Sequence, residues 1–444
     1  MYNFDPMFYA DIRIEDRYST NIVFKNNVFE SIIERKDKRA FIRVFDGIMW
    51  YYASTSEISN VQTELNKLYK QAKPNKDIAS NPVVAKFEVN KDRKIVFTDN
   101  NIRNVSKQDK LDLVKDCFNY LTQPYIKLSV VMYIDRSSLY EFYSSKGADI
   151  KYDHQTAGLN IMYALASQTE QFTGRFGRGE TSFDKLINLG QAITKEVDRG
   201  VDFLLNAKPC KKGNFPVVLS PIVAGVFAHE SFGHKSEADF MLGDETMRKE
   251  WAIGKKVASD ILTIGDTGVE LGSGYVPYDD EGTKATRTYL IKDGILSGRL
   301  HSSQTAVYLK EELTGNARAM NAQYEPIVRM TSTYIGSGDS TFEQLISTIK
   351  EGYFIYDLAH GSGMSQFTIA PTISYEIKDG KIANPVKISV ITGSVFETLG
   401  LIDGLSDKTE MLSFVTGGCG KMEQYPLNVS FGGPYVRVSK MSVQ

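Results

Sequence analysis

Residues 220–234 read Ser-Pro-Ile-Val-Ala-Gly-Val-Phe-Ala-His-Glu-Ser-Phe-Gly-His, and this stretch decides how the second half of the chain is organised. Ser220 is a typical N-cap and Pro221 a typical first helical residue, and the apolar residues that follow have helical spacing. The stretch ends on two histidines, His229 and His234. It therefore predicts an apolar helix that carries chemically active side chains at its carboxyl end.

The two histidines are separated by one residue more than in the zinc-binding pattern HExxH. Side chains four residues apart on an α-helix differ by about 40° around its axis, whereas side chains five apart differ by about 140°. A metal ion shared by His229 and His234 therefore requires a π-type bulge or a kink, for which Gly233 offers backbone freedom. Glu230 is then placed to take a proton from water as a general base. The alternative is a chance pattern of hydrogen-bonded core histidines beside a solvated glutamate.

Three cysteines are too few for a disulfide framework. Cys117 falls in an apolar helical pattern and is predicted to be a core residue, whereas Cys210 is predicted to lie in a loop. Cys419 stands in the sequence Gly-Gly-Cys-Gly-Lys, where glycines allow close backbone approach and Lys421 favours the thiolate. Cys419 is therefore a candidate third zinc ligand. The open alternative is a glycine-rich turn with an incidental cysteine.

The composition of the chain is that of a folded protein with more than one domain. Its 444 residues are 42% hydrophobic and 24% charged, with a net charge of −2. The absence of a basic excess argues against a nucleic-acid partner, and no apolar stretch is long enough to span a bilayer. The residues after Met1 lack the features of a signal peptide, so a cytoplasmic location is expected.

We expect an α+β fold with a boundary in the Lys-Gly loop near residue 211. Residues 1–210 are predicted to form an α/β domain in which helices flank an antiparallel or mixed sheet. Residues 211–444 are predicted to form a β-rich domain, barrel-like or sandwich-like, that carries the metal helix. Asp293-Gly294 and Asp379-Gly380 are typical hairpin turns of this half.

The hydrophobic patterns also give expectations for individual elements. The alternation over residues 7–53 predicts a small antiparallel sheet. Separate strands are predicted over 127–134 and 139–143. A long helix is predicted over 181–205, and a single strand over 327–335.

Several motifs together make the chain resemble the TldD/PmbA family, the modulators of DNA gyrase, which are metallopeptidases with an HExxxH motif. The motifs follow the family's order along nearly the whole chain. They are Pro216–Pro221, His229–His234, Glu237–Asp239, Asp279–Thr283, Leu290–Gly298, Arg329–Tyr334, Cys419–Lys421 and Gly432–Pro434.

The resemblance implies that His229, His234 and Cys419 bind zinc and that Glu230 is the catalytic carboxylate. It also implies a peptidase that cleaves flexible or unfolded peptides, and a dimer with an enclosed metal site. The partner is either a second copy of the chain or a metal-free paralogue. The competing interpretation is a catalytically inert subunit that binds peptides or completes the site of another chain. No membrane or nucleic-acid partner is implied.

Other polar residues have a functional and a structural interpretation. Glu237 and Asp239 either orient a ligand imidazole or end a solvated helix. Asp279–Glu281 is predicted to form a loop-fixing turn, with a substrate or subunit contact as the alternative. His301 and His360 have no partner at ligand spacing, although each is a candidate donor to an oxyanion.

Overall fold

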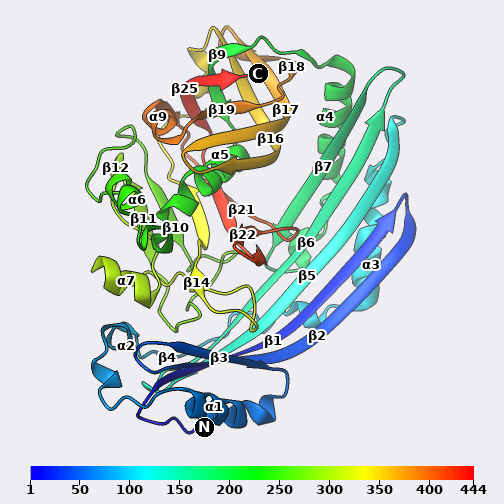
Figure 1. Ribbon diagram of the computed structural model, residues 1–444. Coiled ribbons are helices and arrows are strands. Elements are labelled where there is room, and N and C mark those ends of the chain that lie inside the picture. Colours follow the sequence, from blue (N-terminus) through cyan, green and yellow to red (C-terminus); the bar gives the residue numbers. More distant parts are fainter. Residues whose placement is uncertain (1) are drawn as a thin grey trace.

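The computed structural model describes residues 2–444 and has an α+β fold. A long curved sheet formed by the N-terminal half lies against a β-rich C-terminal half (Figure 1). The division between residues 210 and 211 stays a prediction. The strands of the first sheet end at Glu180, however, and every later strand belongs to other sheets.

The first sheet has seven strands in the order β3-β2-β1-β5-β6-β4, with β7 also paired to β6. Its strands are β1 (Tyr9–Lys25), β2 (Val28–Phe45), β3 (Trp50–Thr55), β4 (Lys91–Lys94), β5 (Ile126–Ser144), β6 (Asp149–Ala166) and β7 (Gln171–Glu180). Its helices are α1 (Val61–Gln71), α2 (Pro82–Lys86), α3 (Lys107–Asp116) and α4 (Gly190–Asn206). In Figure 1, α1 and α3 lie on the side of the sheet away from the C-terminal half.

The sheet is larger than predicted because its strands continue through polar residues. The tight turn between β1 and β2 is formed by Asn26 and Asn27, which both have the positive φ of a hairpin turn. The two strands predicted over 127–134 and 139–143 are one strand, β5, which pairs with β1 on one side and β6 on the other. The polar residues between them belong to the paired ladder rather than to a turn.

The helix predicted over 181–205 is wrong in its first part. Residues 171–180 form β7, and α4 begins only at Gly190. Asn188 has a φ of 65°, which is incompatible with a continuous right-handed helix. Leu186 is buried from a 3₁₀ turn at Asp184–Leu186 instead, and Ile187 is exposed.

The C-terminal half contains a closed barrel of five strands. The ring β16-β9-β25-β19-β17 closes because β16 pairs with both β9 and β17. The elements of this sheet are β8 (Lys208–Pro209), β9 (Gly213–Leu219), β16 (Glu351–Gly363), β17 (Gln366–Lys378), β18 (Lys381–Lys387), β19 (Ile391–Ser394), β20 (Ile402–Leu405) and β25 (Val436–Val443). The barrel confirms one of the two architectures expected for this half.

A six-stranded sheet in the order β12-β11-β10-β15-β24-β21 stands beside the barrel. Its strands are β10 (Ile264–Thr267), β11 (Arg287–Lys292), β12 (Ile295–Leu296), β15 (Ser332–Ile335), β21 (Glu410–Ser413) and β24 (Ser430–Gly433). Two small hairpins pair β13 (Ala317–Arg318) with β14 (Ile327–Val328), and β22 (Cys419–Lys421) with β23 (Gln424–Leu427). The helices are α5 (Pro221–Ala228), α6 (Glu245–Glu250), α7 (Ser303–Leu309), α8 (Phe342–Ser347) and α9 (Val395–Gly400).

The strand predicted over 327–335 is split between two sheets. Asp266 accepts hydrogen bonds from the backbone N–H of Thr331 (3.0 Å) and from the hydroxyl of Thr333 (2.9 Å), and these fix the chain where it leaves β14 for β15. The hairpin turns at Asp293-Gly294 and Asp379-Gly380 form as predicted. Over residues 2–444, no helix combines the length and apolar character needed to cross a membrane.

Candidate metal centre

Helix α5 leaves the barrel strand β9 and packs between β16 and β24. Ser220 is its N-cap: its hydroxyl accepts from Val223 N (3.4 Å) and donates to Tyr356 O (2.7 Å). Pro221 is its first residue, as predicted. Val223 and Phe227 are fully buried, so the apolar face of the helix is held in the main core of this half.

The segment His229–Gly233 continues α5 as one turn of π-helix, which confirms the predicted bulge. The backbone N–H of His234 bonds to the carbonyl of His229, five residues earlier. This wider turn brings the two imidazoles together, with ring centroids 5.2 Å apart.

Gly233 serves the turn in a way that differs from the prediction. Its φ is −55°, an ordinary helical value, so backbone freedom is not what the position needs. A Cβ at this position would lie 2.1 Å from Met330 Sδ. Glycine therefore leaves the space that the Met330 side chain occupies beside the π-turn.

Cys419 reaches the histidine pair from β22, 185 residues further along the chain. Its Sγ lies 3.5 Å from His234 Nε2, and one ligand atom from each of His229, His234 and Cys419 lies within 4.8 Å of the others. Ideal tetrahedral zinc, with Zn–S of about 2.3 Å and Zn–N of about 2.0 Å, has an S···N edge of about 3.5 Å. The separation of Cys419 and His234 therefore equals this edge, and the three side chains lie close enough together to hold a metal ion.

The electrostatics of the three side chains also suit a cation. Burial alone raises the pKa of the Cys419 thiol, but His229 and His234 outweigh it and hold this pKa well below its usual range. Burial lowers the pKa of His234, but hydrogen bonds with Cys419 and Glu237 outweigh burial and raise it to about 10. The sulfur is therefore a thiolate, the protonation state that a metal requires.

His229 and Glu230 differ in their access to solvent. His229 is buried, and its Nδ1 has no hydrogen-bond partner within residues 2–444, which fits a residue whose partner is a ligand. The side chain of Glu230 is 34% exposed, and its Oε2 lies 4.0 Å from His234 Nε2. Glu230 therefore stands at the mouth of the centre, where water and a ligand can reach it.

Glu237 and Asp239 belong to a buried network behind His234. Glu237 lies 3.2 Å from His234 Nδ1 and 3.1 Å from Lys421 Nζ, and Asp239 lies 2.6 Å from the same Nζ. Burial raises the pKa of Glu237, but His234 and Lys421 outweigh it and the net pKa is lowered. Lys421 was predicted to act on the thiolate, but its ammonium pairs with these two carboxylates instead.

The other predicted candidates lie away from the cluster or have structural partners. The ring nitrogens of His301 contact Thr305 Oγ1 (3.1 Å) and Glu311 Oε2 (2.9 Å), so neither is free for an oxyanion. His360 is exposed on β16, next to Gly361, which packs beside Glu230. Asp279 accepts from the backbone N–H of Glu281, Thr283 and Ala317, as expected of a loop-fixing turn.

Two residues of the centre were not identified as functional from the sequence. The fully buried Arg329 donates to the carbonyl of Cys419 (2.8 Å) and fixes the backbone of the ligand. Phe431 packs against the His229 ring at a centroid distance of 5.7 Å. The motif Arg329–Tyr334 carried a signal for the arginine, but its contacts join segments too distant for a local pattern to predict.

Comparisons with known proteins identify the family to which the chain belongs. The family model described as the PmbA/TldA metallopeptidase C-terminal domain matches residues 212–444, and that of the PmbA/TldA metallopeptidase domain 1 matches residues 10–73. A metalloprotease of Methanocaldococcus jannaschii is 32% identical over 439 residues, which cover 97% of this chain and 95% of the relative.

Two further relatives extend the likeness. The zinc metalloprotease TldD homolog of Saccharolobus solfataricus is 29% identical over 98% of this chain and 96% of its own length. The crystal structure of TldE from Thermococcus kodakarensis has a TM-score of 0.75 at 15% identity, covering 98% of this chain and 96% of that one, and so shares the fold. With a family model covering more than half of its length, this chain belongs to the PmbA/TldD family of metallopeptidases.

Proposed function

We propose that the protein is a zinc-dependent peptidase in which His229, His234 and Cys419 bind the metal and Glu230 is the general base. The observation that carries this proposal is the separation of 3.5 Å between Cys419 Sγ and His234 Nε2, at the end of a π-turn that brings His229 to the same point. Two imidazoles and a thiolate are ligands that zinc prefers, and three protein ligands leave a fourth position open.

Zinc, when bound, supplies a Lewis acid that polarises a peptide carbonyl and makes water a better nucleophile. The residues of the chain then have distinct roles. Glu230, at the mouth of the centre, accepts a proton from the attacking water and passes it to the leaving amine. Glu237 orients His234 through its Nδ1 and leaves Nε2 facing Cys419.

The burial of the centre supports flexible peptides as substrates. His229 and Cys419 are both less than 5% exposed, and only Glu230 has substantial access to solvent. A peptide bond within a folded domain is held in place by its neighbours, whereas an extended segment can enter such a site. We therefore propose unfolded or flexible peptides as the substrate class.

The test is the variant Glu230→Gln, which keeps the shape of the side chain and removes its basicity. Turnover of an unstructured peptide should fall by about 10²–10⁴-fold, while one zinc ion per chain is retained by elemental analysis. Glu245→Gln, at an exposed carboxylate on α6, is the matched control and should keep full turnover. Undiminished turnover in Glu230→Gln would refute the general-base role.

The zinc content of the purified wild-type protein tests the metal assignment separately. About one zinc per chain supports the peptidase. A metal-free protein that binds peptides without cleaving them would favour an inert partner subunit. The dimer implied by the family resemblance, with a second copy or a metal-free paralogue, is also a proposal, and light scattering of the purified chain alone measures it.

A further inference from the structure

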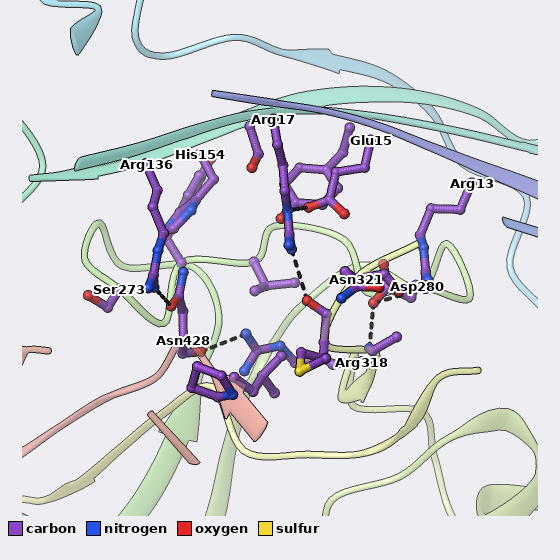
Figure 2. A pocket seen from close by; sticks show the side chains of 18 of the residues that line it. Arg13, Glu15, Arg17, Arg136, His154, Ser273, Asp280, Arg318, Asn321 and Asn428 are labelled. Atoms are coloured by element: carbon purple, nitrogen blue, oxygen red, sulfur yellow. Dashed lines mark hydrogen bonds and ion pairs between the residues drawn. The ribbon is translucent and has the colours of Figure 1, made fainter. Parts of the chain in front are cut away.

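A cavity of about 310 Å³ lies between the first sheet and the C-terminal half. One wall is formed by side chains of β1, β5 and β6, and the other by C-terminal loops and the β22–β23 hairpin. Figure 2 shows Arg17 pointing from the sheet into this space and Arg318 entering it from the opposite wall. The volume is within the range of small-ligand pockets.

The lining of the cavity carries an excess of positive charge. It contains four arginines (Arg13, Arg17, Arg136 and Arg318) but only two carboxylates (Glu15 and Asp280), which leaves a formal charge of +2. The two carboxylates are already paired: Glu15 lies 2.6 Å from Arg17, and Asp280 lies 3.2 Å from Arg13. The excess therefore resides on the other two arginines.

Arg136 and Arg318 form no ion pair with any acid within residues 2–444. Arg136 donates one hydrogen bond, to Asn428 Oδ1 (2.8 Å), while Arg318 donates to the carbonyls of Met330 and Asn428. Neutral oxygens solvate a guanidinium but do not neutralise it. Arg318 is buried and Arg136 is half-buried. Because charges withdrawn from solvent in proteins are nearly always paired, two such arginines in one cavity indicate an anionic partner.

The pKa values of residues that line the cavity reflect the same excess of positive charge. Burial lowers the pKa of Arg136, and Arg17 lowers it further. Burial also lowers the pKa of His154 to about 4, with contributions from Arg318, Arg17 and Arg136. His154 is therefore neutral, and its Nε2 donates to the carbonyl of Gly272 (3.1 Å).

The cavity shares a wall with the metal centre. Tyr425, Pro426 and Leu427 of β23 line it, and Leu427 pairs directly with Cys419 across the hairpin. Paired strands lie about 4.8 Å apart, so the cavity wall lies one strand spacing from the backbone of Cys419. Met330 is a second connection between the cavity and the metal centre. Arg318 donates a hydrogen bond to the Met330 carbonyl, and the Met330 sulfur packs against the π-turn at Gly233.

We propose that this cavity is a substrate subsite that binds a peptide carboxylate through Arg136 and Arg318. The inference rests on the proposed peptidase function and adds a preference: peptides with a carboxylate at the matching distance from the scissile bond are favoured. The carboxylate is either the α-carboxylate of the peptide or an aspartate or glutamate side chain.

The chemistry of the lining fits a carboxylate. The planar fork of a guanidinium matches the two oxygens of a carboxylate. Glu15 and Asp280 line the same cavity and reduce its net formal charge to +2. One or two carboxylates can neutralise this charge. Tyr425 and Pro426 contribute apolar surface for the adjoining peptide backbone.

The test measures binding to the zinc-loaded Glu230→Gln protein, so that substrate is held but not cleaved. Three N-acetylated alanine peptides of equal length are compared by calorimetry: the free acid, the C-terminal amide, and an amide with one internal glutamate. At least one carboxylate peptide should bind about 10-fold or more tighter than the plain amide, the effect of one charge-assisted contact. The free-acid and glutamate arms distinguish the two sources of the carboxylate.

Arg136→Gln, introduced into the same Glu230→Gln protein, should abolish this preference and leave binding of the plain amide unchanged. Arg136 is the better site for substitution because, within residues 2–444, its side chain donates a hydrogen bond to Asn428 alone, whereas Arg318 also supports Met330. The matched control is Arg39→Gln on β2, whose side chain forms an ion pair of 3.4 Å with Asp37. It should keep the preference, and thermal unfolding confirms that both variants are folded.

Equal binding of all three peptides would overturn the inference, as would a carboxylate preference that survives in Arg136→Gln. These results are independent of the peptidase assignment, which turnover by the wild-type protein decides. Cleavage without an Arg136-dependent preference refutes the subsite alone. A preference that depends on Arg136, in a protein that cleaves no peptide, supports the subsite and refutes the peptidase.

Discussion

Each half of the chain buries a lysine against carboxylates, and the two clusters differ in what surrounds them. In the first sheet, Lys110 of α3 lies 2.6 Å from Asp135 of β5, with both side chains at most 1% exposed. Beside the metal centre, Lys421 lies 3.1 Å from Glu237 and 2.6 Å from Asp239. Both are buried ion pairs, but only the second continues to a candidate metal ligand.

The Lys110 cluster is closed, in the sense that the lysine and the aspartate are surrounded by neutral hydrogen-bonding groups of the first sheet. The ammonium contacts the hydroxyls of Tyr18 (3.2 Å) and Thr20 (3.1 Å), and Asp135 accepts from the backbone N–H of Thr20 (2.8 Å) and the hydroxyl of Tyr133 (2.8 Å). The network begins and ends within the N-terminal half. Its effect is therefore on stability, and it joins α3 to two strands.

The Lys421 cluster is open, in the sense that one of its carboxylates also contacts a candidate metal ligand. Glu237 is shared between Lys421 and His234, so the carboxylate fixes both the ring orientation and the proton on Nδ1. The comparison teaches that burial of an ion pair does not itself indicate function. The informative feature is a partner that also contacts a reactive group.

The largest effect expected is on stability, in Lys110→Met. Removing the ammonium leaves Asp135 buried without a counter-charge, which should lower the free energy of unfolding by about 3–5 kcal/mol. Urea denaturation at pH 7 measures the loss. Zinc-dependent turnover of the folded fraction should stay within about 2-fold of wild type, because the cluster makes no contact with the metal centre.

The double variant Lys110→Met/Asp135→Asn is the control for that prediction. It removes the uncompensated charge while the asparagine still accepts from Thr20 N, so it should recover at least half of the lost stability. If single and double variants lost the same stability, the charge of Asp135 would not be the cause. If Lys110→Met instead lost turnover but no stability, the division between the two clusters would be wrong.

The same contrast explains which features could be predicted from the sequence. The metal helix was predictable because its signals are local: a Ser220 cap, Pro221 at the first position, and a histidine spacing that required a bulge. Cys419 was identified by its glycine neighbours and the family resemblance. The contact of Glu237 with His234 was one of two interpretations, because these residues are three apart in the chain. The ion pairs of Lys110 and Lys421 were not predictable, because each joins residues far apart in the chain.

The errors have a similar physical origin. Arg136 and Ser137 interrupt the apolar pattern of β5, so two short strands were predicted. In the structure, Arg136 faces the cavity and donates to Asn428, and Ser137 Oγ accepts from Arg103. Polar residues that find distant partners therefore resemble a turn in the sequence. The displaced start of α4 depends on the positive φ of Asn188, which the apolar spacing does not reveal.

A smaller effect, on metal affinity, is expected for Glu237→Gln. The amide still accepts a hydrogen bond from His234 Nδ1 but carries no charge, so zinc affinity should fall by about 10–100-fold. Competition with a chromophoric chelator at fixed pH measures it. Asp239→Asn is the matched control, because Asp239 contacts Lys421 and not His234.

The control should weaken zinc binding by less than the Glu237 variant does. An equal loss in both variants would mean that the charge around Lys421 matters rather than the contact with His234. Unchanged affinity in Glu237→Gln would remove the distinction between the open and the closed cluster, since both would then serve stability alone.

The smallest effect expected, about 10-fold for a change of one pH unit, is the pH dependence of zinc binding to the metal-free centre. His229 and His234 hold the pKa of Cys419 well below its usual range, and Cys419 and Glu237 raise the pKa of His234 to about 10. At neutral pH the apo protein therefore contains a thiolate–imidazolium pair. Zinc must displace the proton of His234, so zinc affinity should rise about 10-fold per pH unit from pH 6 to 9, through release of one proton.

Alkylation of the metal-free protein by iodoacetamide, read by peptide mass mapping, tests whether Cys419 and His234 form this thiolate–imidazolium pair or are an ordinary thiol and imidazole. The Cys419 rate should be flat between pH 6 and 9, because the thiolate is already formed at the lower end. Cys210 is the internal control: burial raises its pKa, so its rate should climb about 10-fold per pH unit, as a neutral thiol requires. Parallel pH profiles for both cysteines would show that the histidines do not hold Cys419 as a thiolate before a metal ion binds. The metal centre would then resemble the Lys110 cluster, in which no charged group awaits a ligand.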